Sequence, residues 1–200
     1  ENKPTKLHIS KLLRKYTGKG FGSEYSNSMT IGEKNKAMNH FNNNLWFIKP
    51  PNGFKLENIL DSVEQLVKRK GIDCFVIDAW NKLEHNYSGN ETKYIGQSLD
   101  MLADFCEKNQ VHCFLVAHPT KVPKENDEFL IPSLYNIAGS ANFFNKTDNG
   151  ITVYRRKDPD PNIQDKTEIH IQKVKFNHWG EVGQIDYNFN KVSLRYYQGV

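Results

Sequence analysis

The sequence predicts an α/β fold in which a parallel sheet is flanked by helices. Residues 73–78 (DCFVID) and 111–118 (VHCFLVAH) are almost continuously apolar, and the amphipathic segment 91–109 lies between them. Strand, helix, strand in this order, with apolar strands, is typical of parallel strands that are covered on both faces. From Gly150 onward, β-prone segments alternate with turn-rich segments, which predicts antiparallel strands that extend the same sheet.

Apolar spacing and capping residues predict the other elements. Helices are expected over 5–16, 31–44 and 56–70, a short strand over 45–48 and a short helix over 139–146. Thr5 is the expected cap of the first helix, and Gly18 and Gly71 are the expected ends of the first and third. Strands are expected over 150–156, 167–176, 183–189 and 192–197, and a polar loop over 119–133.

Composition narrows the class of protein. The 200 residues are enough for one domain with a substantial core, and a net charge of only +4 does not by itself mark a nucleic-acid binder. No apolar run is long enough to span a bilayer, and no signal peptide is visible. The three cysteines lie in apolar patterns without metal-ligand spacing, which predicts buried, reduced thiols in a cytosol-like compartment.

Polar residues end the two apolar strands. Asp78 closes the first strand and His118 follows the second. The carboxyl ends of neighbouring parallel strands meet at one edge of a sheet, where ligands bind. An aspartate there is also what a nucleoside triphosphatase uses to hold the water shell of Mg²⁺. A loop-capping aspartate and a structural histidine explain the same pattern, so these two residues alone do not distinguish a nucleotide site from a structural role.

Longer stretches carry a family resemblance. The resembling segments are ENKPTKLHISKLLRKYTGK (1–19), FVIDAWN (75–81), FLVAHPTK (114–121), LYNIAGSANFFNKTDNGITVYRR (134–156) and IQKVKFNHWGEVGQIDYNF (171–189). In this order they resemble the RecA-like ATPase core of hexameric replicative DNA helicases of the DnaB type. The similarity looks closest to the branch that contains mitochondrial Twinkle and phage helicase-primases, and it extends over nearly the whole chain.

The resemblance implies a RecA-like P-loop NTPase core that forms a single domain over residues 1–200. It implies an ATP-dependent helicase that uses ATP or another NTP with Mg²⁺ and moves 5′→3′ on single-stranded DNA. The implied partners are five further copies in a homo-hexamer and a fused or separate primase, without a membrane. The implied location is the cytoplasm of a bacterial or phage-infected cell.

One family feature is absent from the sequence. No G-x-x-x-x-G-K-[ST] phosphate loop occurs in the 200 residues. The resemblance therefore predicts that the chain is the C-terminal part of the core and that the phosphate loop lies upstream of Glu1. The segment TGKGFGS (17–23) has the wrong spacing and is expected to be an ordinary loop. Without the phosphate cradle, the chain alone is expected to be inactive.

The resemblance also implies residue roles. Glu1 would activate the attacking water, His118 would contact the γ-phosphate, and Asp78 would hold Mg²⁺ through water. The implied nucleotide-binding residues are Asn145, Lys173, Lys175 and Arg155, with Arg156 as a neighbouring candidate. The implied DNA-binding residues are Lys121, Lys124, Ser140, Asn142 and Lys146. Lys175 stands where the family usually has arginine, and a lysine lacks the planar fork of the guanidinium.

Other interpretations stay open at this point. A RecA-like recombinase or regulatory ATPase shares the aspartate, and a non-catalytic DNA- or partner-binding module explains the missing phosphate loop. A metal-dependent nuclease built on Asp78 and His118 lacks a second acidic cluster. Trp80 is expected to pack beside the magnesium site together with Asn81, and Phe143 and Phe144 are expected in the core rather than against bases.

Overall fold

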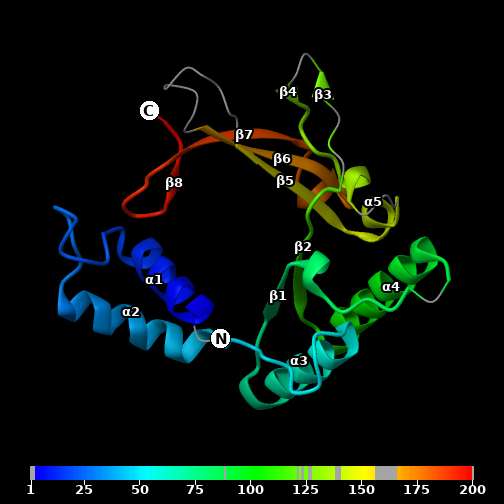
Figure 1. Ribbon diagram of the computed structural model, residues 1–200, viewed down its shortest axis with the longest axis horizontal. Coiled ribbons are helices and arrows are strands. Elements are labelled where there is room, and N and C mark those ends of the chain that lie inside the picture. The colour runs from blue at the N-terminus through cyan, green and yellow to red at the C-terminus, as the bar shows by residue number, and fades with distance from the viewer. Residues whose placement is uncertain are drawn as a thin grey trace. The chain divides into compact units, whose positions relative to one another are not determined.

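The computed structural model describes residues 3–87, 89–120, 122, 124–125, 128–137, 141–155 and 166–199. The chain forms two compact units (Figure 1). The first unit comprises Glu1–Phe47, Arg155–Ile169 and Ile185–Val200, and the second comprises Ile48–Tyr154 and His170–Gln184. None of the described helices combines the length and the apolar character that a membrane span requires.

The second unit contains the predicted strand, helix, strand segment. Its elements are α3 (Leu56–Lys70), β1 (Cys74–Asp78), α4 (Glu91–Asn109) and β2 (His112–Val116). The strands β1 and β2 pair in parallel, with Cys74 opposite His112 and Asp78 opposite Val116. The predicted parallel pairing is therefore confirmed.

Helix α3 forms because its apolar side chains recur at helical spacing. Ile59, Leu60 and Val63 lie on one buried stripe of the helix. The helix ends where Gly71 adopts a left-handed φ of 64° and donates its N–H to the carbonyl of Val67. The buried stripe packs, together with Leu102 of α4, against the inward side chains of β1.

Among the described residues of the second unit, helices α3 and α4 pack on one face of the parallel strands, whereas the sequence predicts cover on both faces. Side chains alternate along a strand, so Phe75 and Ile77 point toward α3 and α4 and are buried. On the opposite face Val76 is 61% exposed and Phe114 is 53% exposed. Cys74 shares this outer face and is an exposed free thiol, whereas burial raises the pKa of Cys113 to about 12.

Two local predictions are wrong. Residues 45–48 have the composition of a strand, and Leu45 has extended backbone angles (φ −139°, ψ 129°), but this segment pairs with no other described residue. Without a ladder partner an apolar segment is not a strand. Thr5 does not cap the first helix, because α1 (Lys3–Thr17) begins before it.

The predicted C-terminal strands are present as β5 (Asn149–Arg155), β6 (Lys166–Val174), β7 (Gly183–Phe189) and β8 (Tyr196–Tyr197). Hydrogen bonds group them into a sheet of their own, in the order β5-β6-β7-β8, rather than adding them to β1 and β2. A small antiparallel hairpin, β3 (Lys124–Glu125) with β4 (Glu128–Phe129), precedes them. The short elements are α5 (Asn142–Lys146) and the 3₁₀ helices η1 (Trp80–Lys82), η2 (Leu134–Asn136) and η3 (Asn177–Trp179).

In the first unit, two arginines fasten α1 to the segment that precedes β8. The Arg14 Nε donates to the carbonyl of Val192 at 2.7 Å. The Arg195 guanidinium donates in the opposite direction, to the carbonyls of Lys15 at 2.6 Å and Tyr16 at 2.7 Å. These carbonyls lie in the last turn of α1, where a positive charge is favourable to the helix dipole.

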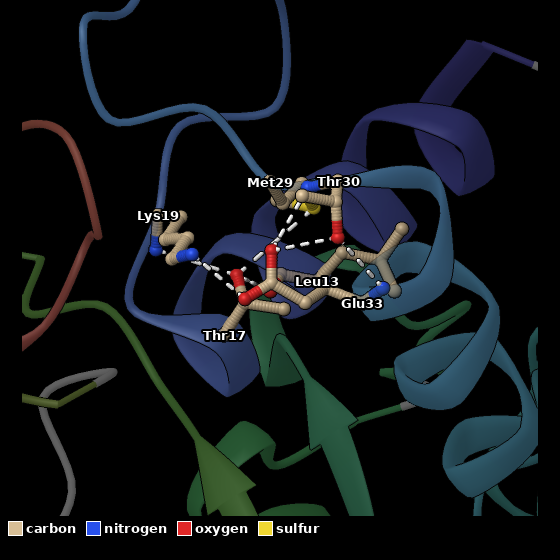
Figure 2. A network of polar contacts seen from close by, with 6 residues as sticks. All are labelled: Leu13, Thr17, Lys19, Met29, Thr30 and Glu33. Carbon is tan, nitrogen blue, oxygen red and sulfur yellow. Dashed lines mark hydrogen bonds and ion pairs between the residues drawn. The ribbon is translucent and has the colours of Figure 1, made fainter.

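A capping box begins α2 (Ile31–Asn44). The Thr30 N–H donates to Glu33 Oε2 at 2.8 Å, and the Glu33 N–H donates to Thr30 Oγ1 at 3.2 Å (Figure 2). The same carboxylate forms an ion pair with Lys19 Nζ at 2.7 Å. Residues 18–23 form an irregular loop, as predicted, and the ammonium of its lysine faces Glu33.

Replacing Lys19 by methionine is expected to raise the pKa of Glu33. The hydrogen bond from Lys19, followed by that from the Thr30 backbone, lowers this pKa from its ordinary 4.5 to about 2. Because the folded pKa is depressed, the stabilisation from this contact is present above pH 4.5 and is lost as pH falls toward 2. NMR titration of the Glu33 side chain measures the shift. Lys19→Arg retains the ion pair as a control, and an unchanged Glu33 pKa in Lys19→Met would contradict the assignment.

Candidate functional site

The candidate site lies at the carboxyl edge of β1 and β2. Asp78 is the last residue of β1 and lies opposite Val116, the last residue of β2, and His118 follows two positions later. The side chains of Asp78 and His118 are both exposed. The two polar residues singled out in the sequence therefore sit at one edge of one parallel pair of strands.

Asn81 links the two loops that leave this edge. Its Oδ1 accepts a hydrogen bond from the His118 N–H at 2.8 Å, and its Nδ2 lies 3.5 Å from the His118 carbonyl oxygen. A side-chain amide can bond to the N–H and the carbonyl of one residue, as a neighbouring strand does. Asn81 therefore holds the loop after β2 against the loop after β1. The sequence places Asn81 beside Asp78 but does not show this contact.

The loop after β2 is fastened a second time beyond His118. The N–H of Thr120 donates to the carbonyl of Asn136 in η2 at 2.9 Å, and Pro119 forms a β-bridge with Ile137. The segment that leaves the candidate site therefore runs directly into contact with η2.

Trp80 packs into a hydrophobic cluster next to the turn that follows Asp78. It is 1% exposed and packs edge-to-face against Phe143 of α5, with ring centroids 5.6 Å apart. Ile95 of α4 completes this cluster. The predicted packing roles of Trp80 and Phe143 are thus confirmed, and the loop that carries Asn81 rests on a hydrophobic base.

The chemistry of Asp78 fits a hydrated Mg²⁺ ion. Within the described ranges, no group of three or more His, Cys, Asp or Glu side chains is arranged to hold a metal, and no residue forms an ion pair with Asp78. Mg²⁺ commonly keeps several waters and binds through one or two carboxylates together with substrate phosphates. One exposed carboxylate at a strand end is compatible with that mode.

The predicted nucleotide-binding lysines contact their own chain. Lys173 Nζ donates to the carbonyls of Phe144 at 2.6 Å and Asn145 at 3.2 Å, at the end of α5. Lys175 Nζ forms an ion pair with Asp148 at 2.6 Å. In the first unit, the Arg155 guanidinium lies 5.9 Å from the centroid of the Phe189 ring. Their roles toward nucleotide stay predictions.

The predicted DNA-binding residues of α5 lie against α4. Asn142 Nδ2 donates to the carbonyl of Thr92 at 2.8 Å, and Lys146 forms an ion pair with Asp100. An open cleft of about 430 Å³ lies here, lined by Asn90, Thr92, Lys93, Gly96, Gln97, Asp100, Asn142 and Lys146. Lys124 of β3 places its ammonium 4.6 Å from the centroid of the Phe129 ring.

Four predicted residues, Glu1, Lys121, Ser140 and Arg156, lie outside the described residues. The roles assigned to them rest on the family resemblance.

Comparison with known proteins identifies the relatives of the chain. No protein-family model matches it. It is 32% identical over 191 residues to the Twinkle homolog protein of chloroplasts and mitochondria from Arabidopsis thaliana, a match that covers 92% of this chain. The chain spans 26% of the length of that relative.

Two solved structures share the fold. One is an ATPase domain that superposes with a TM-score of 0.76 at 19% identity, covering 96% of this chain and 70% of that one. The other, a DnaB-like replicative helicase, superposes with a TM-score of 0.70 at 19% identity, covering 94% of this chain and 47% of that one. The chain is similar over most of its length to part of a Twinkle homolog, and it shares its fold with an ATPase domain and a DnaB-like replicative helicase. The α/β, RecA-like fold and the family resemblance predicted from the sequence are confirmed.

Proposed function

We propose that this chain is part of the ATPase core of a replicative DNA helicase of the DnaB and Twinkle type. One observation carries the proposal: in a chain 32% identical to a Twinkle homolog, Asp78 ends β1 and His118 follows β2 at the same edge of the strand pair. Residues 1–200 would form a single RecA-like domain in which residues outside this sequence supply the phosphate loop.

In this proposal the enzyme hydrolyses ATP or another NTP between subunits. The bound Mg²⁺ would supply charge neutralisation for the phosphates. Asp78 holds its water shell, His118 contacts the γ-phosphate, and Glu1 positions the attacking water. Lys173, Lys175, Arg155 and Asn145 face nucleotide at the subunit boundary.

The proposed polymer substrate is single-stranded DNA, threaded through a homo-hexamer in the 5′→3′ direction. Lys121 and Lys124 on the loop after β2, with Ser140, Asn142 and Lys146 near α5, would neutralise its phosphates, so that affinity falls with salt. The structurally similar DnaB-like replicative helicase interacts with primase. We extend the same partner, fused or separate, to the full-length protein in a bacterial or phage-infected cytoplasm.

A non-catalytic DNA- or partner-binding module is the second candidate. One observation favours it: Lys175 replaces the usual arginine of the family and is already paired with Asp148 at 2.6 Å. A lysine held in this way supplies no planar fork to a neighbouring subunit's ATP.

Unwinding of tailed DNA duplexes by the full-length protein tests the proposal. Duplexes with a 5′ or a 3′ single-stranded tail are incubated with ATP or with a non-hydrolysable analogue. We expect strand separation only with ATP, and only when the 5′ tail is present. DNA binding without ATP turnover or unwinding would instead support the binding module, and unwinding that requires the 3′ tail would reverse the proposed direction.

A further inference from the structure

Tyr135 is an exposed aromatic residue in an otherwise well-packed turn. In η2, Tyr135 is 52% exposed while the adjacent Leu134 is only 8% exposed. A tyrosine combines a large apolar ring with a polar hydroxyl, and this combination suits contact surfaces that are partly wet.

One side of the Tyr135 ring is already supported. It stacks on Phe144 of α5 with ring centroids 4.5 Å apart and an interplanar angle of 20°. Lys173 Nζ lies 5.1 Å from the centroid of the Phe144 ring and also donates to the Phe144 carbonyl. The supporting ring therefore also contacts a cation, while Tyr135 remains 52% exposed.

The turn that carries Tyr135 is rigidly held. The Ser133 N–H donates to Asn136 Oδ1 at 2.7 Å, which closes the turn on itself. From β6, Gln172 Oε1 accepts from the Leu134 N–H at 3.1 Å and Gln172 Nε2 donates to the Pro132 carbonyl at 2.8 Å. The Gln172 side-chain amide thus binds a backbone N–H and a backbone carbonyl at the start of the turn.

The Leu134 side chain packs the turn against β5. A Cβ built on Gly150 of β5 would lie 2.1 Å from Leu134 Cδ1, so this side chain rests directly on the backbone of β5. The backbone that carries Tyr135 is therefore held by contacts within the chain, and holding a binding element in place lowers the entropic cost of binding.

We propose that Tyr135 is a base-stacking contact for single-stranded DNA. The inference rests on the proposed function and adds to it a contact with bases. A single strand offers unstacked bases and negative phosphates together, and aromatic rings beside cations are the groups that bind both. A cation lies at this stack, since Lys173 Nζ is 5.1 Å from the centroid of the Phe144 ring.

Binding of the full-length protein to fluorescently labelled oligothymidylate tests the stacking role. Tyr135→Leu removes the ring, and we expect it to weaken binding roughly tenfold. Tyr135→Phe keeps the ring and should bind like the wild type. Because stacking involves no charge, Tyr135→Leu should leave the slope of affinity against salt unchanged, whereas the control Lys124→Ala should flatten it.

An abasic oligonucleotide of the same length separates stacking from other effects. The wild type should lose roughly tenfold in affinity when bases are absent, and Tyr135→Leu should bind both strands alike. Equal binding of oligothymidylate by the wild type and Tyr135→Leu would overturn the inference alone. An equal loss by Tyr135→Leu on both strands would indicate a structural role and would also overturn it. A wild-type protein that binds no single strand would overturn the proposed function as well.

Discussion

Replacing Asp78 by asparagine in the full-length protein should reduce ATP turnover by at least about 100-fold. The change removes the negative charge that would hold the water shell of Mg²⁺ and keeps the size of the side chain. Asp78 is exposed and forms no ion pair with a described residue, so the fold should be unaffected. Steady-state phosphate release with saturating DNA measures the effect, and circular dichroism checks the fold.

Asp73 provides a matched control at the other end of the same strand. It directly precedes β1 and is also exposed. Asp73→Asn alters the same charge far from the carboxyl edge, so turnover should match that of the wild type. Equal turnover in Asp78→Asn and in Asp73→Asn would remove Asp78 from the magnesium site.

Replacing Trp80 by alanine should lower the free energy of unfolding by about 3–5 kcal/mol, the range for truncating a buried tryptophan. The substitution leaves a cavity among Phe143, Ile95 and the loop that carries Asn81. Urea denaturation followed by circular dichroism measures the loss. Because Asn81 and Trp80 belong to the same turn, ATP turnover should fall at temperatures where the variant is still folded.

Trp179→Ala is the control for this measurement. Trp179 is 57% exposed and contacts Phe176 and His178 at the surface of η3. Its truncation should cost less than about 1 kcal/mol, as is usual for surface substitutions. A similar loss of stability in both variants would show that Trp80 is not the anchor of the turn.

The carboxyl edge was predictable from sequence because it follows from strand direction alone. Once two parallel apolar strands are joined by a helix, their ends share an edge, so Asp78 and the loop that carries His118 lie at the same edge. The contact of Asn81 with His118 was not predictable, since it joins residues 37 positions apart through loop geometry. The exposure of Tyr135 likewise depends on which side of η2 buries Leu134.

The errors have a physical cause as well. A continuous apolar strand does not show how many of its faces are covered, and Val76 and Phe114 lie on the exposed face of β1 and β2. Residues 45–48 have strand-forming side chains, but a strand also requires a neighbour that hydrogen-bonds to it. The β-propensity of a segment shows that it can adopt an extended conformation, but whether it pairs with another strand depends on the rest of the molecule.

Two hydrogen-bonded contacts hold the loop after β2 between the edge that carries Asp78 and η2, the turn that carries Tyr135. The backbone of His118 is gripped by Asn81, and only two residues later Thr120 is tied to Asn136, the immediate neighbour of Tyr135. A displacement of His118 must therefore either break one of these hydrogen bonds or carry η2 with it. The segment from His118 to Thr120 therefore couples movement at the carboxyl edge to movement of η2.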